Sequence, residues 1–251
     1  MDKILKTQNL FKKFDGISAL NNFSCFVEKN EILGLIGPNG AGKTTFFNVV
    51  TGFLPSDSGD VYFHGKQISN KSPYRIVADG ISRTFQDLRL IRQLNVLDNV
   101  LLSFQNQAGE KLSGVFFQKN KIIQTELQNR KKAESLLEYT DLSELANEPA
   151  GNLSYGQQKL LSIVCCLAAD AKLLLLDEPV AGINPSMREK ILSVIEDQKK
   201  EGKSIVIIEH DMDFIMEICD RVIFMDTGEK ISEGTPGEVR NDPKVIEAYL
   251  E

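Results

Sequence analysis

The sequence predicts an α/β fold built around a parallel sheet. Three short apolar runs (32–36, 173–176 and 205–208) are typical of strands that are buried on both faces of such a sheet. Residues 186–200, between the second and third runs, have an amphipathic helical pattern, so this part predicts a strand–helix–strand unit. A glycine-rich loop follows the first run and leads into a helical segment, which completes the α/β pattern.

The first third of the chain predicts an antiparallel section around the first of these strands. The runs 4–14 and 18–27 alternate loosely and are separated by Asp15-Gly16, a turn typical of a β-hairpin. A second small hairpin is predicted at 61–68, with His64-Gly65 at its tip.

The middle of the chain is polar and helical from about residue 95 to 139, with apolar residues near helical spacing. Pro149-Ala150-Gly151 interrupts this region before a helix expected at 155–169. After the strand–helix–strand unit, a hairpin across Thr227-Gly228 and a short helix at 243–250 complete the predicted elements.

The glycine-rich loop is Gly37-Pro38-Asn39-Gly40-Ala41-Gly42-Lys43-Thr44-Thr45, which fits the phosphate-binding P-loop pattern in full. Its glycines let the backbone turn tightly and bring N–H groups close to phosphate oxygens. The start of the following helix adds its positive dipole end. Lys43 supplies a charge to the β- and γ-phosphates, and the Thr44 hydroxyl can ligate Mg²⁺. We therefore expect the chain to bind a nucleoside triphosphate.

Two acids, Asp177 and Glu178, directly follow the buried run 173–176. Ligands bind at the carboxyl ends of strands in such sheets, so these carboxylates should lie next to the P-loop. Asp177 is the expected Mg²⁺ partner, and Glu178 is placed to polarise the attacking water as a general base. The alternative is a strand followed by a solvated acidic turn.

The segment Leu153-Ser154-Tyr155-Gly156-Gln157-Gln158 is the third signal. On physical grounds Ser154 can be the N-cap of the next helix, whose first-turn N–H groups are free to bind an anion. The order P-loop, Gln86, this segment, Asp177-Glu178 and His210 resembles the ATPase subunit of ATP-binding cassette (ABC) transporters over essentially the whole chain.

The resemblance implies a role for each matching residue. Phe14 corresponds to the aromatic that stacks on adenine, and the alternative is a core strand residue. Gln86 corresponds to the Q-loop glutamine, which reaches Mg²⁺ and the attacking water. Ser154 and Gly156 would contact the γ-phosphate of ATP held by the opposite subunit, and His210 would be the switch histidine on the γ-phosphate.

The resemblance also implies the assembly. Two ATP molecules would be held between two cassettes, with residues 1–86 and 160–251 as a core that includes the antiparallel section, and about 87–159 as a helical subdomain. Expected partners are two transmembrane permease subunits, a second cassette ATPase, with a heterodimer favoured over a homodimer, and a solute-binding protein. We expect the segment 87–100, which contains Leu88 and Leu90, to dock a coupling helix of a permease subunit.

Two departures from the common family pattern indicate one branch of it. Tyr155 stands where Gly is usual, and 181–185 reads Ala-Gly-Ile-Asn-Pro in the D-loop. Both resemble ATPase subunits of bacterial branched-chain amino acid importers, as do the segments 82–90, 209–212, and 233–236 with 241–250. Subunits for urea or short amides share much of this pattern. Lipopolysaccharide exporter subunits and soluble ABC ATPases are further alternatives.

Bulk properties limit other functions. The net charge of −6 argues against a nucleic-acid-binding surface, so no nucleic-acid partner is expected. The N-terminal residues lack the apolar region of a signal peptide, and no run approaches the ~20 apolar residues that span a bilayer. We expect a peripheral protein at the cytoplasmic face of the cell membrane. The four cysteines lack metal-ligand spacing, and Cys165 and Cys166 are expected to be reduced core thiols.

Overall fold

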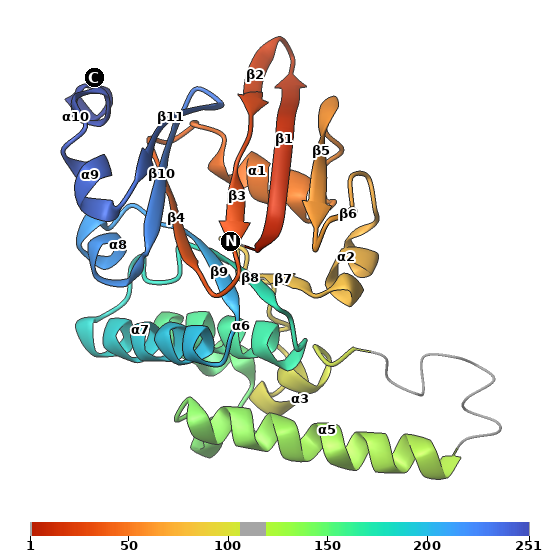
Figure 1. The fold of residues 1–251 in the computed structure, drawn as a ribbon. Helices are drawn as coiled ribbons and strands as arrows, with labels where there is room; N and C mark the ends of the chain where they lie inside the picture. Colours follow the sequence, from red (N-terminus) through yellow and green to blue (C-terminus); the bar gives the residue numbers. More distant parts are fainter. Residues whose placement is uncertain (1, 106–118, 251) are drawn as a thin grey trace.

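The computed structural model describes residues 2–105 and 119–250, which fold into two sheets and a set of helices (Figure 1). The larger sheet has the order β11-β10-β4-β9-β8-β7, and all its neighbours are parallel except the hairpin β10–β11. Its strands are β4 (Ile32–Ile36), β7 (Ile81–Arg83), β8 (Leu173–Asp177), β9 (Ser204–Ile208), β10 (Arg221–Asp226) and β11 (Glu229–Gly234). The three predicted buried runs are thus the central strands β4, β9 and β8.

The second sheet is antiparallel, with the order β2-β1-β5-β6, and β3 also pairs with β1. Its strands are β1 (Lys3–Phe14), β2 (Ile17–Phe23), β3 (Phe26–Glu28), β5 (Ser58–Phe63) and β6 (Lys66–Gln67). Both predicted hairpins are confirmed. The predicted run 18–27 is not one strand, because Asn22 has a left-handed backbone (φ 54°) that redirects the chain between β2 and β3.

The helices surround the parallel sheet. They are α1 (Lys43–Val50), α2 (Pro73–Asp79), α3 (Val96–Leu101), α5 (Lys119–Tyr139), α6 (Tyr155–Ala168), α7 (Pro185–Lys200), α8 (Met212–Ile218), α9 (Pro236–Arg240) and α10 (Pro243–Leu250). The helices expected at 155–169, 186–200 and 243–250 are confirmed. The short helices α2, α8 and α9 were not predicted, because five to seven residues are too few to show a helical period.

Residues of the parallel strands face two apolar cores in alternation. In β9, for example, Ile205 and Ile207 belong to the core under the helices, whereas Val206 and Ile208 belong to the core under the antiparallel sheet. This explains why these strands read as continuous apolar runs. Figure 1 shows α5 on the side of the molecule away from the antiparallel sheet. Within the described ranges, no helix has both the length and the apolar character needed to cross a membrane.

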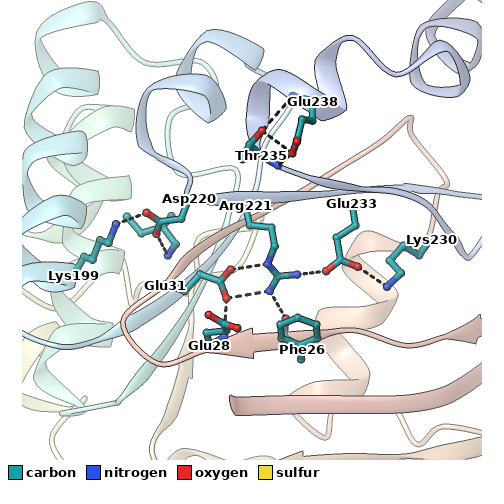
Figure 2. Close-up of polar contacts among 11 residues, drawn as sticks. Phe26, Glu28, Glu31, Lys199, Asp220, Arg221, Lys230, Glu233, Thr235 and Glu238 are labelled. Atoms are coloured by element: carbon teal, nitrogen blue, oxygen red, sulfur yellow. Dashed lines mark hydrogen bonds and ion pairs between the residues drawn. The ribbon is translucent and has the colours of Figure 1, made fainter. Parts of the chain in front are cut away.

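A partly buried ionic network joins the start of β10 to the β3–β4 turn (Figure 2). The Arg221 guanidinium donates to both carboxylate oxygens of Glu31, at 2.7 and 3.0 Å, and to the carbonyl of Phe26 at 2.8 Å. It also donates to Glu233 on β11. Segments 190 residues apart in the sequence are joined by this one side chain.

Candidate active site

The predicted site residues gather at one edge of the parallel sheet. The P-loop follows β4, His210 follows β9, Glu178 follows β8 and Gln86 follows β7, and these four strands are consecutive neighbours. The strands are parallel, so their carboxyl ends meet at the same edge. The position predicted for the acids next to the P-loop therefore agrees with the structure.

Close packing fixes the shape of the P-loop. A Cβ on Gly37 would lie 1.9 Å from the carbonyl oxygen of Met225, and one on Gly42 would lie 2.1 Å from that of Ala19. Both glycines also have positive φ, so no other residue fits at either position. The buried Lys43 ammonium donates to the carbonyls of Gly37 at 2.7 Å and Pro38 at 2.8 Å. The charge of Lys43 is thus held inside the loop whose backbone would surround phosphates.

The P-loop charge is linked to the two acids. Burial lowers the pKa of the Lys43 ammonium, while the carboxylates of Glu178 and Asp177 act to raise it. Among the other predicted P-loop residues, Asn39, Gly40 and Thr44 are exposed, Pro38 and Thr45 are half-buried, and Ala41 is buried. The exposed edge of the loop is therefore open to a ligand.

Asp177 is the last residue of β8, and its side chain is buried. Arg83 Nη2 lies 3.2 Å from its Oδ2 atom, and the backbone N–H of Asp177 donates to the Thr84 hydroxyl at 2.9 Å. Burial raises the pKa of Asp177, and the Arg83 charge opposes this shift. Arg83 also donates to Asn48 of α1 at 2.7 Å, so it ties the acid to the P-loop helix. Sequence reasoning missed Arg83 as part of the site, because nothing in its local pattern indicates the Asp177 contact.

Glu178 and His210 form a pair. The His210 Nε2 atom lies 2.8 Å from Glu178 Oε1, and both side chains are partly exposed at the sheet edge. Glu178 has a left-handed backbone (φ 48°), and its N–H donates to the carbonyl of Ile208 at 2.8 Å. The residue expected to polarise water and the residue expected to contact the γ-phosphate are therefore brought within hydrogen-bond distance.

Two buried charges that sequence reasoning did not single out lie behind this pair. Lys159 of α6 donates from Nζ to the carbonyl of Glu178. Glu209 accepts from the backbone N–H groups of Val180, at 2.8 Å, and His210, at 3.1 Å. Burial lowers the pKa of Lys159 and raises that of Glu209, and each group's charge opposes the other's shift. The sequence did carry a signal for Lys159, because it is a charged residue within the otherwise apolar pattern of α6.

The signature segment 153–158 begins α6. Ser154 is its N-cap and forms a capping box with Gln157, as the sequence predicted for the cap. A Cβ on Gly156 would lie 2.9 Å from Met187 Cγ, so a larger residue would have to push aside the Met187 side chain of α7. Tyr155 is half exposed, and a Cβ on Gly182 would lie 3.5 Å from its ring. The two departures from the common pattern, Tyr155 and the 181–185 loop, therefore lie against each other.

Phe14 and Gln86 are exposed and lie at the margins of the site. Phe14 ends β1 at the tip of a hairpin, and the return strand β2 touches the P-loop where the Ala19 carbonyl approaches Gly42. Gln86 lies in a bend two residues after Thr84. The exposure of Phe14, 42%, argues against the alternative of a core strand residue.

The donor set fits magnesium. Oxygen atoms of Thr44, Asp177 and Gln86 are the hard ligands that Mg²⁺ prefers, and Mg²⁺ usually binds through one or two protein carboxylates plus phosphates and water. Across residues 2–105 and 119–250, no group of three or more His, Cys, Asp or Glu side chains could hold a metal ion by itself. That finding is compatible with a metal held mainly by nucleotide phosphates.

Comparisons with known proteins agree with this geometry. The family model "ABC transporter" matches residues 20–181, and the model "Branched-chain amino acid ATP-binding cassette transporter" matches residues 229–250. The chain is 42% identical to "Probable branched-chain amino acid transport ATP-binding protein LivG" of Archaeoglobus fulgidus, covering 99% of this chain and 95% of that protein. It is 36% identical to "High-affinity branched-chain amino acid transport ATP-binding protein LivG" of Escherichia coli K12, covering 98% and 97%.

Solved structures show the same likeness. The crystal structure of a nucleotide-free ATP-binding cassette from an ABC transporter has a TM-score of 0.87, 38% identity and 99% coverage of both chains. The ADP conformation of an ATP-binding cassette of an ABC transporter has a TM-score of 0.85 and 37% identity, covering 100% of this chain and 99% of that one. Fold class and family likeness, as expected from the motifs, are both confirmed.

Proposed function

Because this chain belongs to the ABC transporter family and is one of its ATP-hydrolysing subunits, we propose that it powers the import of branched-chain amino acids. In this proposal ATP closes a dimer of two cassettes, and hydrolysis lets it open and drives the membrane permease. The substrate class is supported by the names of the full-length relatives and by the family match at 229–250.

The observation that carries the chemistry is the meeting of Lys43, Asp177, Glu178 and His210 at one sheet edge. We assign Lys43 and the N–H groups of 37–45 to the ATP phosphates. Asp177, Thr44 and Gln86 would hold Mg²⁺, which offsets phosphate charge when bound. Glu178 would take the proton of the attacking water, while His210 would contact the γ-phosphate from its position 2.8 Å from Glu178.

The site needs a second subunit in this proposal. Ser154 and Gly156 lie at the exposed N-terminus of a 14-residue helix, whose first-turn N–H groups suit an anion. We assign them to the γ-phosphate of ATP held by the partner cassette, and Phe14 to the adenine of this chain's own ATP. ATP bound between the two subunits would then favour the closed dimer. Hydrolysis would remove this contribution and let the dimer open.

The proposed assembly follows from the same family. The partner cassette is a different ATPase chain in our proposal, and two permease subunits and a solute-binding protein complete the system at the cytoplasmic face of the membrane. We also propose residues 1–86 and 160–251 as the core, and about 87–159 as a helical subdomain. Urea, short amides and exported lipids remain the rival cargoes.

We place the permease contact at a cavity of about 360 Å³ beside the segment 87–100. Arg89 lies over the rings of Phe85, at 3.8 Å, and Phe53, at 5.0 Å, and Ile91 and Leu102 are exposed next to it. Leu90 is only half-buried but packs against the core. Ile91 and Leu102 are therefore better probes of docking than Leu88 and Leu90.

The test of the chemistry is Glu178→Gln. Removing the general base should lower ATP turnover about 10²–10⁴-fold and leave ATP binding intact, so that a dimer accumulates in ATP. Turnover is measured as phosphate release, and the dimer is measured by light scattering during chromatography in ATP. Wild-type turnover in this variant would remove Glu178 from its assigned role.

A further inference from the structure

Lys159 is a buried cation that the proposed chemistry does not use. It lies on the second turn of α6 and is 5% exposed. Its ammonium donates to the carbonyl of Glu178, and the same ammonium lies 5.2 Å from the centroid of the Tyr155 ring. One side chain therefore contacts both the signature segment and the backbone of the general base.

Glu209 compensates the charge of Lys159. It is 1% exposed, and its carboxylate accepts hydrogen bonds from the N–H groups of Val180 and His210. Val180 lies after β8, and His210 lies after β9. Its charge acts on Lys159 more strongly than that of any other acid. Lys159 and Glu209 thus hold the backbone on both sides of the Glu178–His210 pair.

The backbone of Glu178 needs such a constraint. Its φ of 48° lies in the left-handed region, which a residue other than glycine keeps only where the surroundings impose it. The N–H of Glu178 is fixed by Ile208 and its carbonyl by Lys159. Only the Lys159 bond comes from outside the sheet, from the helix that begins at Ser154.

We propose that Lys159 is a positioning residue that sets the Glu178 carboxylate from the signature helix. The inference rests on the proposed function, because Ser154 is there the contact to the partner's ATP. Any shift of α6 when that contact forms is transmitted through Lys159 to the carbonyl of Glu178. The state of one ATP site thereby adjusts the general base of the other.

The experiment uses the complex purified through a tag on this chain, photolabelled with 8-azido-ATP. Labelling of this chain on ice measures binding at its own P-loop, and vanadate-dependent trapping at the working temperature measures hydrolysis there. Lys159→Met should lower the trapping rate about tenfold to a hundredfold, because a small misplacement of a catalytic group has effects of that size. Binding on ice should change less than about threefold, since the P-loop is untouched.

Two further variants separate positioning from a general structural role. Lys159→Arg, which keeps a charged donor, should retain trapping within about threefold, and Lys159→Gln, which keeps one donor, should fall between Arg and Met. Lys203→Met is the matched control. Lys203 is also largely buried, and burial lowers its pKa too, but it precedes β9 at the opposite edge of the sheet. This control should trap at the wild-type rate.

Wild-type trapping in Lys159→Met would overturn the inference, and so would a parallel loss of binding and trapping in Lys159→Met and Lys159→Arg. Failure of the proposed function would give a different experimental result. Glu178→Gln would then be trapped at the wild-type rate, whatever the result at Lys159.

Discussion

At the scale of single residues, the site depends on charges that are held in place before any ligand arrives. Lys43 is buried against the carbonyls of its own loop, and Asp177 is buried against Arg83. Burial works against the charged form of both groups, as the directions of their pKa shifts indicate. A nucleotide phosphate and its metal would give each of them a partner of opposite charge.

The role of Lys43 can be tested by Lys43→Ala. The loss of one charge-assisted contact, worth about 1.5–3 kcal/mol, should weaken ATP binding roughly 10- to 100-fold. A titration with a fluorescent ATP analogue measures the dissociation constant. Lys200→Ala is the control, because Lys200 is 70% exposed and pairs with Asp197 of its own helix. Equal affinities in the two variants would contradict the assignment of Lys43 to the phosphates.

Local sequence predicted the residues of the P-loop, the two acids and the cap of α6, because each is a short pattern with its own physical cause. It could not predict the contacts of Arg83, Lys159 or Glu209. Their roles depend on contacts between segments that are distant in the sequence: Arg83 with Asp177, Lys159 with Glu178, and Glu209 with Val180. Neither the spacing nor the type of these residues shows which segments the sheet order will bring together.

At the scale of elements, the order of the strands determines which loops share the site, and the Arg221 network helps to hold that order. Arg221 joins β10 to the Glu31 carboxylate before β4 and to Glu233 on β11 (Figure 2). Asp220, just before β10, adds a second contact to β4, because its carboxylate accepts from the N–H of Ile32 at 2.8 Å. The strand that leads into the P-loop is thus fixed at its amino end.

We expect Arg221→Met to lower the free energy of unfolding by roughly 3 kcal/mol, because it leaves the Glu31 carboxylate buried and without its main partner. The measurement is the shift of the urea unfolding midpoint. Arg130→Met is the control. Arg130 pairs with Glu134 on the exposed face of α5, and such a pair contributes less than about 1 kcal/mol. Similar losses in the two variants would show that the network does not stabilise the fold.

The elements themselves were largely predictable. Fully apolar runs predicted β4, β8 and β9, and turn residues predicted the three hairpins. The break between β2 and β3 was not predictable, since it depends on the backbone of Asn22 and on pairing with β1. The short helices α8 and α9 begin after the capping residues Asp211 and Thr235, and each is too short to show a helical period in the sequence.

At the scale of the whole molecule, the chain presents two surfaces that its own fold leaves uncovered. One is the exposed start of α6 at Ser154, which we assign to the partner cassette. The other is the cavity bordered by Arg89, Ile91 and Leu102, which we assign to a permease subunit. The two surfaces share one packed core, because the core under α6 also contains residues of α3.

If this ATPase works on a membrane permease, the two proteins should be recovered together in a pull-down. Tagged Glu178→Gln chain is recovered from its native cells in ATP and mild detergent, and its partners are identified by mass spectrometry. We predict two permease subunits and a second cassette ATPase, and loss of the permease subunits when Ile91→Asp and Leu102→Asp are added. Ile246→Asp, at an equally exposed position on α10, should change nothing. Recovery of only soluble partners or nucleic acid would show that this ATPase does not work on a membrane permease.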